Sequence, residues 1–389
     1  MRSFDLIILG GGLAGASLAA ALRESRLSIA LVESQPPTRP AGWDSRIYAI
    51  SPANARFLQG IGVWEHLNSE RITPITAMHV FGDLGAPLDF SAQAAGVKEL
   101  AWVMESSLMA DELWEGIKRQ PNLTRFCPAQ PAALEMRPEA AILTLAEGTQ
   151  LSARLLVGAD GRDSWARQQA GLKAVTTPYG EKGVVANFET ERPHQGIAWQ
   201  WFRDDGVLAY LPLPGQRISI VWSTPDAHAD ELCALSPADL AAQVAQAGQQ
   251  VLGTLTPITP AAAFALRLIT VPQIIAHRLA LVGDAGHGIH PLSGHGINLG
   301  FQDARTLAEQ LAAAPPWQDI GAENFLRRYQ RARKEETWLM QHTTDTLRRL
   351  FRANPALPLL PLFRNLGLSL ANQAKPLKTL LARYALGAF

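Results

Sequence analysis

The chain contains little cysteine and little charge. Cys127 and Cys233 are the only two cysteines among 389 residues, and they lack the close spacing of a zinc or iron–sulfur motif. This excludes a disulfide framework and favours a reducing compartment. Basic and acidic residues number 35 each, so the chain has no overall charge that would attract nucleic acid. We therefore expect neither a structural metal nor a nucleic-acid partner.

Long hydrophobic runs are also scarce. The exception is "LIILGGGLAGASLAAAL", residues 6–22, which resembles a signal peptide or a membrane span in length and composition. Asp5 stands where a signal peptide would carry basic residues, and the glycines fall in one block between a strand pattern and a helix pattern. We interpret the run as strand, turn and helix, with a secretory or spanning segment as the alternative.

The hydrophobic patterns predict two domains of different kinds. Residues 4–9 and 28–33 are short apolar runs typical of buried parallel strands, and the segment between them has a helical pattern, which completes a βαβ unit. From residue 184 onward the pattern alternates, as in "IAWQWF" and "RISIVWS", which predicts an antiparallel meander. The run "RLALVGDA" then returns to the buried-strand pattern. The fold class is α/β, with a nucleotide-binding domain that an antiparallel sheet interrupts.

The turn of the βαβ unit carries a GxGxxG motif. Gly10 permits a sharp turn, Gly12 lets the backbone approach a pyrophosphate, and Gly15 lets the helix pack against the strand. Glu33 ends the second strand, where a carboxylate can accept hydrogen bonds from a ribose diol. An acid at this place disfavours a 2′-phosphate, so the motif predicts FAD or NAD rather than NADP.

Two further strands end in an aspartate. Asp160 lies in "GADGRDSWAR", residues 158–167, where it could also serve only to cap the following helix. Asp284 follows "LALVG", at the edge of the sheet where α/β proteins bind ligands, and could hold the hydroxyls of a ribityl chain. Gly294 and Gly296 lack side chains, so a flat ring could lie against the backbone there.

The order of these motifs resembles a known family. GGGLAG, "DSRIYAIS" (44–51), GADGRDSWAR and GDAGHGIHPLSGHGINLGFQDA (283–304) are similar to motifs of the single-component (class A) flavin hydroxylases. These enzymes have the para-hydroxybenzoate-hydroxylase fold, and the chain is most similar to the ubiquinone-biosynthesis hydroxylases among them, over nearly its whole length.

The resemblance implies a Rossmann-like FAD-binding domain interleaved with an antiparallel β-sheet substrate domain, plus a helical C-terminal segment. We expect the FAD-binding domain at residues 1–75, 100–172 and 272–330. The substrate domain would comprise 76–99 and 173–271, and the helical segment 331–389.

The resemblance also assigns roles to individual residues. It implies that the ADP half of FAD is held by Gly10, Gly12, Gly15 and Glu33, with Arg46 near the flavin and its phosphates. Asp160 would serve both FAD and the nicotinamide donor, Asp284 the ribityl chain, and Pro291, Gly294 and Gly296 the flavin ring. The chain departs from the family at Gly286 and His295, where alanine and glutamine are usual. We interpret His287 and His290 as structural loop residues, and we nominate no catalytic base.

The implied activity is aromatic hydroxylation. In this family NADH or NADPH transiently reduces FAD, O₂ forms a C4a-hydroperoxide, and its distal oxygen passes to an electron-rich ring, here that of a polyprenylated phenol in ubiquinone biosynthesis. The alternatives are a soluble phenol hydroxylase, a halogenase or an isoprenoid reductase of the same fold, or a non-catalytic flavin-binding subunit of a quinone-synthesis assembly.

Aromatic side chains and a basic tail bear on the substrate. Trp199, Trp201, Phe202, Tyr210 and Trp222 lie on predicted strands, where aromatic residues more often form a core than contact a ligand. After Asp345 the chain has no acid but seven basic residues among apolar ones. This tail is either a helical cap or a surface for an anionic membrane. We expect a cytoplasmic protein, peripheral on the inner face of the membrane if the second alternative holds, and near other quinone-biosynthesis proteins.

Overall fold

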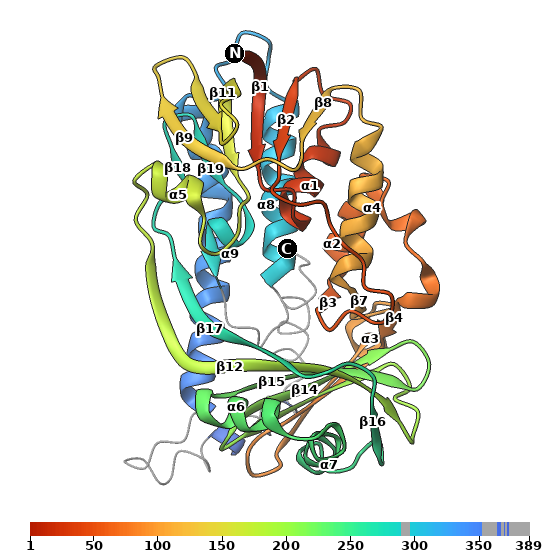
Figure 1. The fold of residues 1–389 in the computed structure, drawn as a ribbon. Helices are drawn as coiled ribbons and strands as arrows, with labels where there is room; N and C mark the ends of the chain where they lie inside the picture. Colours follow the sequence, from red (N-terminus) through yellow and green to blue (C-terminus); the bar gives the residue numbers. More distant parts are fainter. Residues whose placement is uncertain (289–295, 352–363, 367–368, 370–371, 373–389) are drawn as a thin grey trace.

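The computed structural model describes residues 1–288, 296–351, 364–366, 369 and 372. Within these residues the chain forms two large sheets and a small third one, with helices packed around them (Figure 1).

The first sheet is mostly parallel and forms the centre of one lobe. Its strand order is β18-β19-β11-β1-β2-β8, with β10 and β9 added antiparallel beside β11. The strands are β1 (Arg2–Leu9), β2 (Ile29–Val32), β8 (Leu123–Phe126), β9 (Pro131–Met136), β10 (Ala141–Leu145), β11 (Gln150–Gly158), β18 (Ile275–Ala276) and β19 (Leu279–Leu281).

Both faces of this sheet are covered, which explains why its central strands are apolar throughout. Leu6 and Ile8 of β1 pack in a core with α1 (Leu13–Ala21), α4 (Ser106–Lys118) and α8 (Gly296–Ala312). Ile7 and Leu9 point the other way, into a second core with β9 to β11 and α5 (Trp165–Gln169).

The second sheet lies across the lower part of the molecule in Figure 1. Its order is β20-β17-β12-β15-β14-β13-β5-β6, with β16 beside β12, and its neighbours are antiparallel except for β13 and β5. The strands are β5 (Ala77–Phe81), β6 (Pro87–Ser91), β12 (Val175–Thr190), β13 (Ile197–Arg203), β14 (Gly206–Leu213), β15 (Arg217–Pro225), β16 (Leu255–Pro257), β17 (Ala262–Thr270) and β20 (His287–Gly288). Two helices, α6 (Asp226–Ala234) and α7 (Pro237–Ala247), cover its outer face.

A small sheet joins the two lobes. It contains β3 (Ile47–Ile50), β7 (Ala101–Glu105) and β4 (Thr73–Ile75), and α2 (Pro52–Gly60) and α3 (Ala92–Ala95) lie in the same part of the chain. The hydrophobic pattern of residues 51–67 predicts a single helix, but the structure breaks it in two. The first helix ends at Gly60, Gly62 takes a φ of +70°, and a short 3-10 helix follows at Trp64–His66.

The long helix α9 (Glu323–Phe351) connects both large sheets. Near its start the hydroxyl of Tyr329 donates to the carbonyl of Leu281 on β19, at 2.8 Å. Near its end Arg348 pairs with Glu181 on β12, at 2.6 Å. This helix begins before residue 331, where the C-terminal segment is predicted to start.

We propose the same division into FAD-binding domain, substrate domain and C-terminal segment that the sequence predicts. In support, each predicted boundary between the first two falls in a connection between strands of different sheets. One short strand, β20, pairs with β17 of the second sheet although it lies in the predicted FAD-binding segment 272–330.

The hydrophobic run at residues 6–22 is divided between β1 and α1. In the part of the chain that the structure describes, no helix is both long and apolar enough to cross a membrane.

Candidate cofactor site

The turn between β1 and α1 depends on two of its glycines for packing. Gly10 has a φ of +105°, and a Cβ on it would lie 2.4 Å from the carbonyl oxygen of Ala159. A Cβ on Gly15 would lie 2.0 Å from the carbonyl oxygen of Gly10. A Cβ on Gly12 would meet nothing within 4 Å. Gly12 is therefore the position at which the motif leaves open space.

The N-terminus of α1 fits the pyrophosphate of a dinucleotide. Gly12 is its N-cap, no side chain caps it, and its first turn contains no acid. The first N–H groups of a helix have no partner within the helix and carry partial positive charge. A pyrophosphate placed in the open space at Gly12 would satisfy them. The residues present therefore fit the FAD that the motifs predict.

Glu33, the predicted ribose ligand, holds the glycine turn in this structure. One carboxylate oxygen accepts from the N–H of Gly11 at 2.6 Å. The other accepts from the N–H and hydroxyl of Ser34, at 2.7 and 2.9 Å, and from the N–H of Gln35 at 3.2 Å. A carboxylate offers about four acceptor sites, and these four donors use all of them. A ribose hydroxyl would therefore have to displace one donor, such as the rotatable hydroxyl of Ser34.

Asp160 caps a helix in this structure. Its carboxylate accepts from the hydroxyl of Ser164 at 2.5 Å and from the N–H of Ala166 at 2.9 Å, at the start of α5. This is the structural alternative that the sequence left open, and a role toward FAD or nicotinamide stays a prediction. The neighbouring Ala159 N–H donates to Leu9 at 2.7 Å, so the second motif lies directly against the first.

The second motif also contacts the third. Arg162 Nε lies 3.0 Å from an oxygen of Asp284, and both side chains are about two-fifths exposed, at 42% and 41%. Burial raises the pKa of Tyr48 on β3, and the charges of Arg46, Asp284 and Arg162 all act on that pKa. The phenol of Tyr48, on the small sheet, is therefore within electrostatic reach of all three side chains.

Arg46 stands at the start of β3 with an exposed side chain. Within the described part of the chain it has no hydrogen bond or ion pair through its guanidinium, so it is available to an anion. Its backbone carbonyl accepts from the N–H of Ser106 at 2.9 Å, which fixes the strand next to α4.

The predicted ring-binding loop is described only in part. Pro291, Gly294, His290 and His295 lie outside the described residues. Gly296 begins α8, and a Cβ on it would meet nothing within 4 Å. Among the described residues of this motif, Gly296 therefore has room beside its backbone, and contact with the flavin ring stays a prediction.

Several residues that the sequence did not single out support this site. Asn298 on α8 accepts from the N–H of Ser51 at 2.9 Å and donates to the carbonyl of Ala49 at 2.8 Å, which fastens α8 to β3. Trp114 donates to the carbonyl of Gly11 at 2.8 Å. Asp303 binds both Gly283 and His287, as described below. Asn298 and Asp303 lie within the quoted third motif, whereas nothing local in the sequence marks Trp114.

The aromatic residues of the second sheet form a core. Trp199, Trp201, Tyr210 and Trp222 pack with residues of α6 and α7, on the face that points away from the first lobe. The opposite face carries Val185, Gln200, Ala209, Leu211 and Val221, of which the last three are half-buried.

This inner face looks toward the cofactor lobe. Asn187, on the same face as Val185, donates to the carbonyl of Asp44 at 2.9 Å. Ala198 and Leu213 pack against Ile47 and Val103 of the small sheet. A substrate between the two lobes would therefore meet a mostly apolar floor that also carries Gln200 and Asn187.

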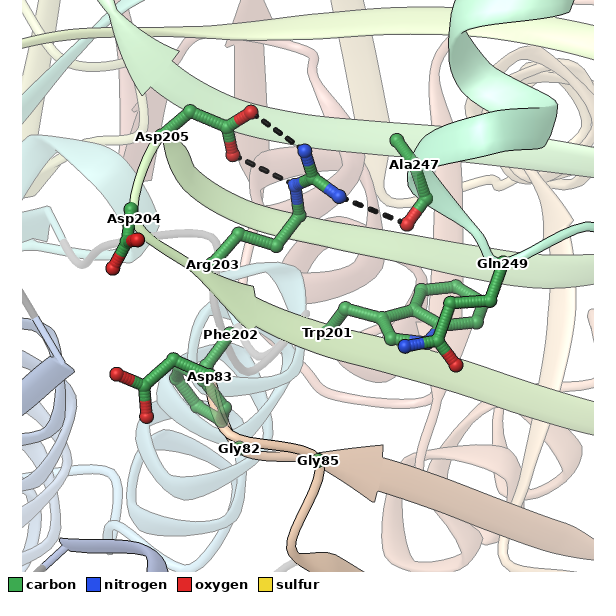
Figure 2. Close-up of a pocket in the computed structure, with 10 residues that line it drawn as sticks. All are labelled: Gly82, Asp83, Gly85, Trp201, Phe202, Arg203, Asp204, Asp205, Ala247 and Gln249. Carbon is green, nitrogen blue, oxygen red and sulfur yellow. Dashed lines mark hydrogen bonds and ion pairs between the residues drawn. The ribbon is translucent and has the colours of Figure 1, made fainter. Parts of the chain in front are cut away.

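A separate pocket of about 310 Å³ lies at the far end of β13, between two strand turns and the end of α7 (Figure 2). Arg203 pairs with both oxygens of Asp205, at 2.7 and 2.8 Å, and donates to the carbonyl of Ala247 at 3.0 Å. Asp83 on another wall pairs with Arg364. None of the predicted cofactor residues lines this pocket.

Comparison with known proteins now identifies the family. Residues 3–344 match the model of the FAD binding domain family. The chain is 38% identical over 387 residues to ubiquinone hydroxylase UbiL of Rhodospirillum rubrum, covering 98% of this chain and 89% of that protein. It is 33% identical to 3-demethoxyubiquinol 3-hydroxylase of Escherichia coli, covering 98% of each.

The chain belongs to the FAD-dependent hydroxylases of ubiquinone biosynthesis. The fold of this flavin monooxygenase agrees with solved structures. P. aeruginosa PqsL has a TM-score of 0.78 at 19% identity, covering 97% of this chain and 99% of that one. p-Nitrophenol 4-monooxygenase PnpA of Pseudomonas putida has a TM-score of 0.79 at 16% identity, covering 98% and 97%. The predicted family, fold class and FAD cofactor are confirmed.

Proposed function

We propose that this FAD-dependent hydroxylase acts on the aromatic ring of a polyprenylated phenol, with O₂ as co-substrate and NADH or NADPH as a transient electron donor. The observation that carries the proposal is the apolar inner face of the second sheet opposite the cofactor lobe. An isoprenoid chain would bury its surface there, at roughly 25 cal/mol per Å² of apolar area.

The bound FAD supplies oxygen activation and the transfer of one oxygen atom to the ring. We propose that Gly12 and the N-terminus of α1 bind its pyrophosphate, Glu33 its ribose and Asp284 its ribityl chain. Arg46 would contribute positive charge near the flavin, and Asp160 would serve both FAD and the nicotinamide donor. Pro291, Gly294 and Gly296 would line the flavin ring.

The chain orients the substrate and excludes water. Gln200 is a polar residue of the inner face, as are Asn187 and Ser219, and its amide can hydrogen-bond the ring hydroxyl of a phenol. The aromatic core keeps water from the outer face of the sheet, and Phe351 packs against Phe202, which lies on the same inner face as Gln200. Water exclusion prevents the activated oxygen from being lost as peroxide.

The test is turnover of the purified holoenzyme. The FAD-loaded protein receives NADH or NADPH, ¹⁸O₂ and a phenol with or without a prenyl chain, and the product is analysed by mass spectrometry. We expect one labelled oxygen on the prenylated ring and a much lower rate with the unprenylated phenol. Equal rates would favour a soluble phenol hydroxylase. Product without label would favour a reductase, and stable bound FAD without turnover a non-catalytic subunit.

We also propose that the protein is cytoplasmic and binds the inner face of the membrane near other quinone-biosynthesis proteins. The exposed side of α9 supports this. It carries Arg328, Arg331 and Lys334 beside Trp338 and Leu339, whose exposed fractions are 55% and 37%. Basic side chains next to an exposed tryptophan suit an anionic lipid surface. Most of the basic tail after Asp345 lies outside the described residues.

A further inference from the structure

A buried carboxylate fastens the turn that carries Asp284. Asp303 on α8 is fully buried. Its Oδ2 accepts from the N–H of Gly283 at 2.8 Å and from Nε2 of His287 at 2.6 Å. These donors stand on either side of Asp284 in the chain, so one oxygen atom holds both ends of the turn.

Helix α9 in turn holds this carboxylate. Arg333 donates from Nε to Oδ1 of Asp303 at 2.7 Å and from a terminal nitrogen to Gln302 at 3.1 Å, and it also pairs with Glu336. The side chains of Arg333 and Asp303 are 3% and 1% exposed. Loss of one partner from such a buried group leaves an uncompensated charge, so the arrangement fixes its members firmly.

The charges within this group support one another. Burial alone would lower the pKa of His287, but the charge of Asp303 and the hydrogen bond to it outweigh burial and raise that pKa. Arg333 opposes the rise, and Asp284 adds to it. Burial alone would raise the pKa of Asp303, but His287 and Arg333 lower it. Tyr329 lies close enough for the charges of Asp303 and Arg333 to act on its hydroxyl, and burial raises its pKa well above the usual value.

We propose that Asp303 is a positioning residue for FAD. It fixes Asp284 by holding Gly283 and His287, and Arg333 fixes Asp303. The inference rests on the proposed contact of Asp284 with the ribityl chain, and it adds that the affinity for FAD depends on a carboxylate and an arginine that do not touch the cofactor.

A double-mutant cycle tests this coupling. The dissociation constant of FAD is measured by fluorescence quenching on the full-length apoprotein, for the wild type, Asp284→Ala, Asp303→Asn and the double variant. Asparagine keeps the size of Asp303 and one acceptor oxygen, which can still receive the N–H of Gly283. The other oxygen becomes an NH2 group that cannot accept from Arg333. The change therefore removes the negative charge and one of the hydrogen bonds that hold the side chain. We expect each single variant to bind FAD about tenfold more weakly and the double variant to bind no more weakly than either, because coupled residues are not additive.

The outcomes separate the inference from the site assignment. A hundredfold loss in the double variant, or an unchanged affinity in Asp303→Asn, would overturn the role of Asp303 while leaving Asp284 at the site. An unchanged affinity in Asp284→Ala would overturn both.

A second pair of variants covers the case in which Asp303→Asn does not fold. His287→Gln then replaces Asp303→Asn, both alone and combined with Asp284→Ala. This change keeps the ion pair between Asp303 and Arg333. His194→Gln is the matched control, because His194 is also buried but its ring bonds the backbone of Leu213 and Gly196. We expect weaker FAD binding in His287→Gln alone. An equal loss in both variants would show a general effect on stability and overturn the proposal.

Discussion

Gly12 and Gly15 belong to one motif but have different physical roles. A methyl group on Gly15 would overlap the Gly10 carbonyl oxygen, at 2.0 Å, so the helix or the turn must move. A methyl group on Gly12 would lie in open space. One position therefore serves the packing of the apoprotein, and the other leaves the open space in which we propose that the pyrophosphate binds.

We expect Gly15→Ala to lower the stability of the apoprotein by about 1–3 kcal/mol, the usual cost of overpacking, and to abolish FAD binding. Gly12→Ala should change the stability by no more than about 1 kcal/mol, the loss of a favourable N-cap, yet weaken FAD binding at least tenfold. Thermal melting of the apoproteins and FAD titration measure the two effects. Wild-type affinity in Gly12→Ala would place the pyrophosphate elsewhere.

His287 gives a prediction of pH dependence. Because its folded pKa is raised above 6.5, it contributes stability below pH 6.5 that is lost as the pH rises through the folded pKa. The difference in unfolding free energy between the wild-type apoprotein and His287→Gln should therefore be largest below pH 6.5 and shrink toward alkaline pH. Urea unfolding from about pH 5 to about pH 9 measures this difference. A difference that grows with pH would show that His287 is neutral in the fold.

At the scale of elements, α9 holds the two lobes together. Its N-terminal half contacts β19 and α8, and at its C-terminal end Phe351 stacks on Phe202 of the second sheet, with ring centroids 3.9 Å apart. Phe351 is 4% exposed, whereas its neighbour Leu350 is 37% exposed.

We expect Phe351→Ala to lower the free energy of unfolding by about 3 kcal/mol, as for other buried aromatic residues. Leu350→Ala should lower it by less than about 1 kcal/mol, because an exposed side chain loses little packing. Urea unfolding of both apoproteins compares them under the same conditions. Equal effects would mean that the end of α9 is not docked on the sheet.

The length of each element follows from local residues to different degrees. The apolar run at 28–33 corresponds closely to β2, and the helical pattern of residues 106–119 corresponds closely to α4. The helix predicted for 51–67 did not anticipate its break at Gly62, and α6 was not predicted at all. Where a helix breaks depends on the geometry of the turn, and whether a short helix forms depends on its packing against a sheet. Neither can be read from one segment of the sequence.

At the scale of the whole molecule, charge is balanced, with 35 basic and 35 acidic residues. Attraction to a membrane would therefore have to come from a local patch such as the exposed side of α9. Each basic side chain near an anionic surface contributes about 1 kcal/mol.

We expect the holoenzyme to sediment with vesicles that contain anionic lipid and not with neutral ones. Arg331→Glu combined with Lys334→Glu should weaken this binding at least tenfold, because two attractions of about 1 kcal/mol each become repulsions. Lys98→Glu with Arg192→Glu makes the same change in net charge outside α9 and should have little effect. If both pairs weakened binding equally, net charge rather than α9 would be responsible.

The sequence by itself determined the cofactor, the family and the alternation of two kinds of sheet. These depend on short motifs and on periodicity, which are local: a glycine turn between strand and helix, an acid at the end of a strand, an apolar residue at every second position.

The tertiary structure decided which partners those residues have. Asp160 caps a helix, and Asp284 forms an ion pair with Arg162. Asp303 forms an ion pair with Arg333 of α9, a helix that begins 20 residues later in the chain. It also decided that Trp199, Trp201, Tyr210 and Trp222 face α6 and α7, whereas Phe202 packs against Phe351 of α9. Such pairings depend on which surfaces are buried together when distant segments pack, and a pattern within one segment carries no information about the surface that will cover it.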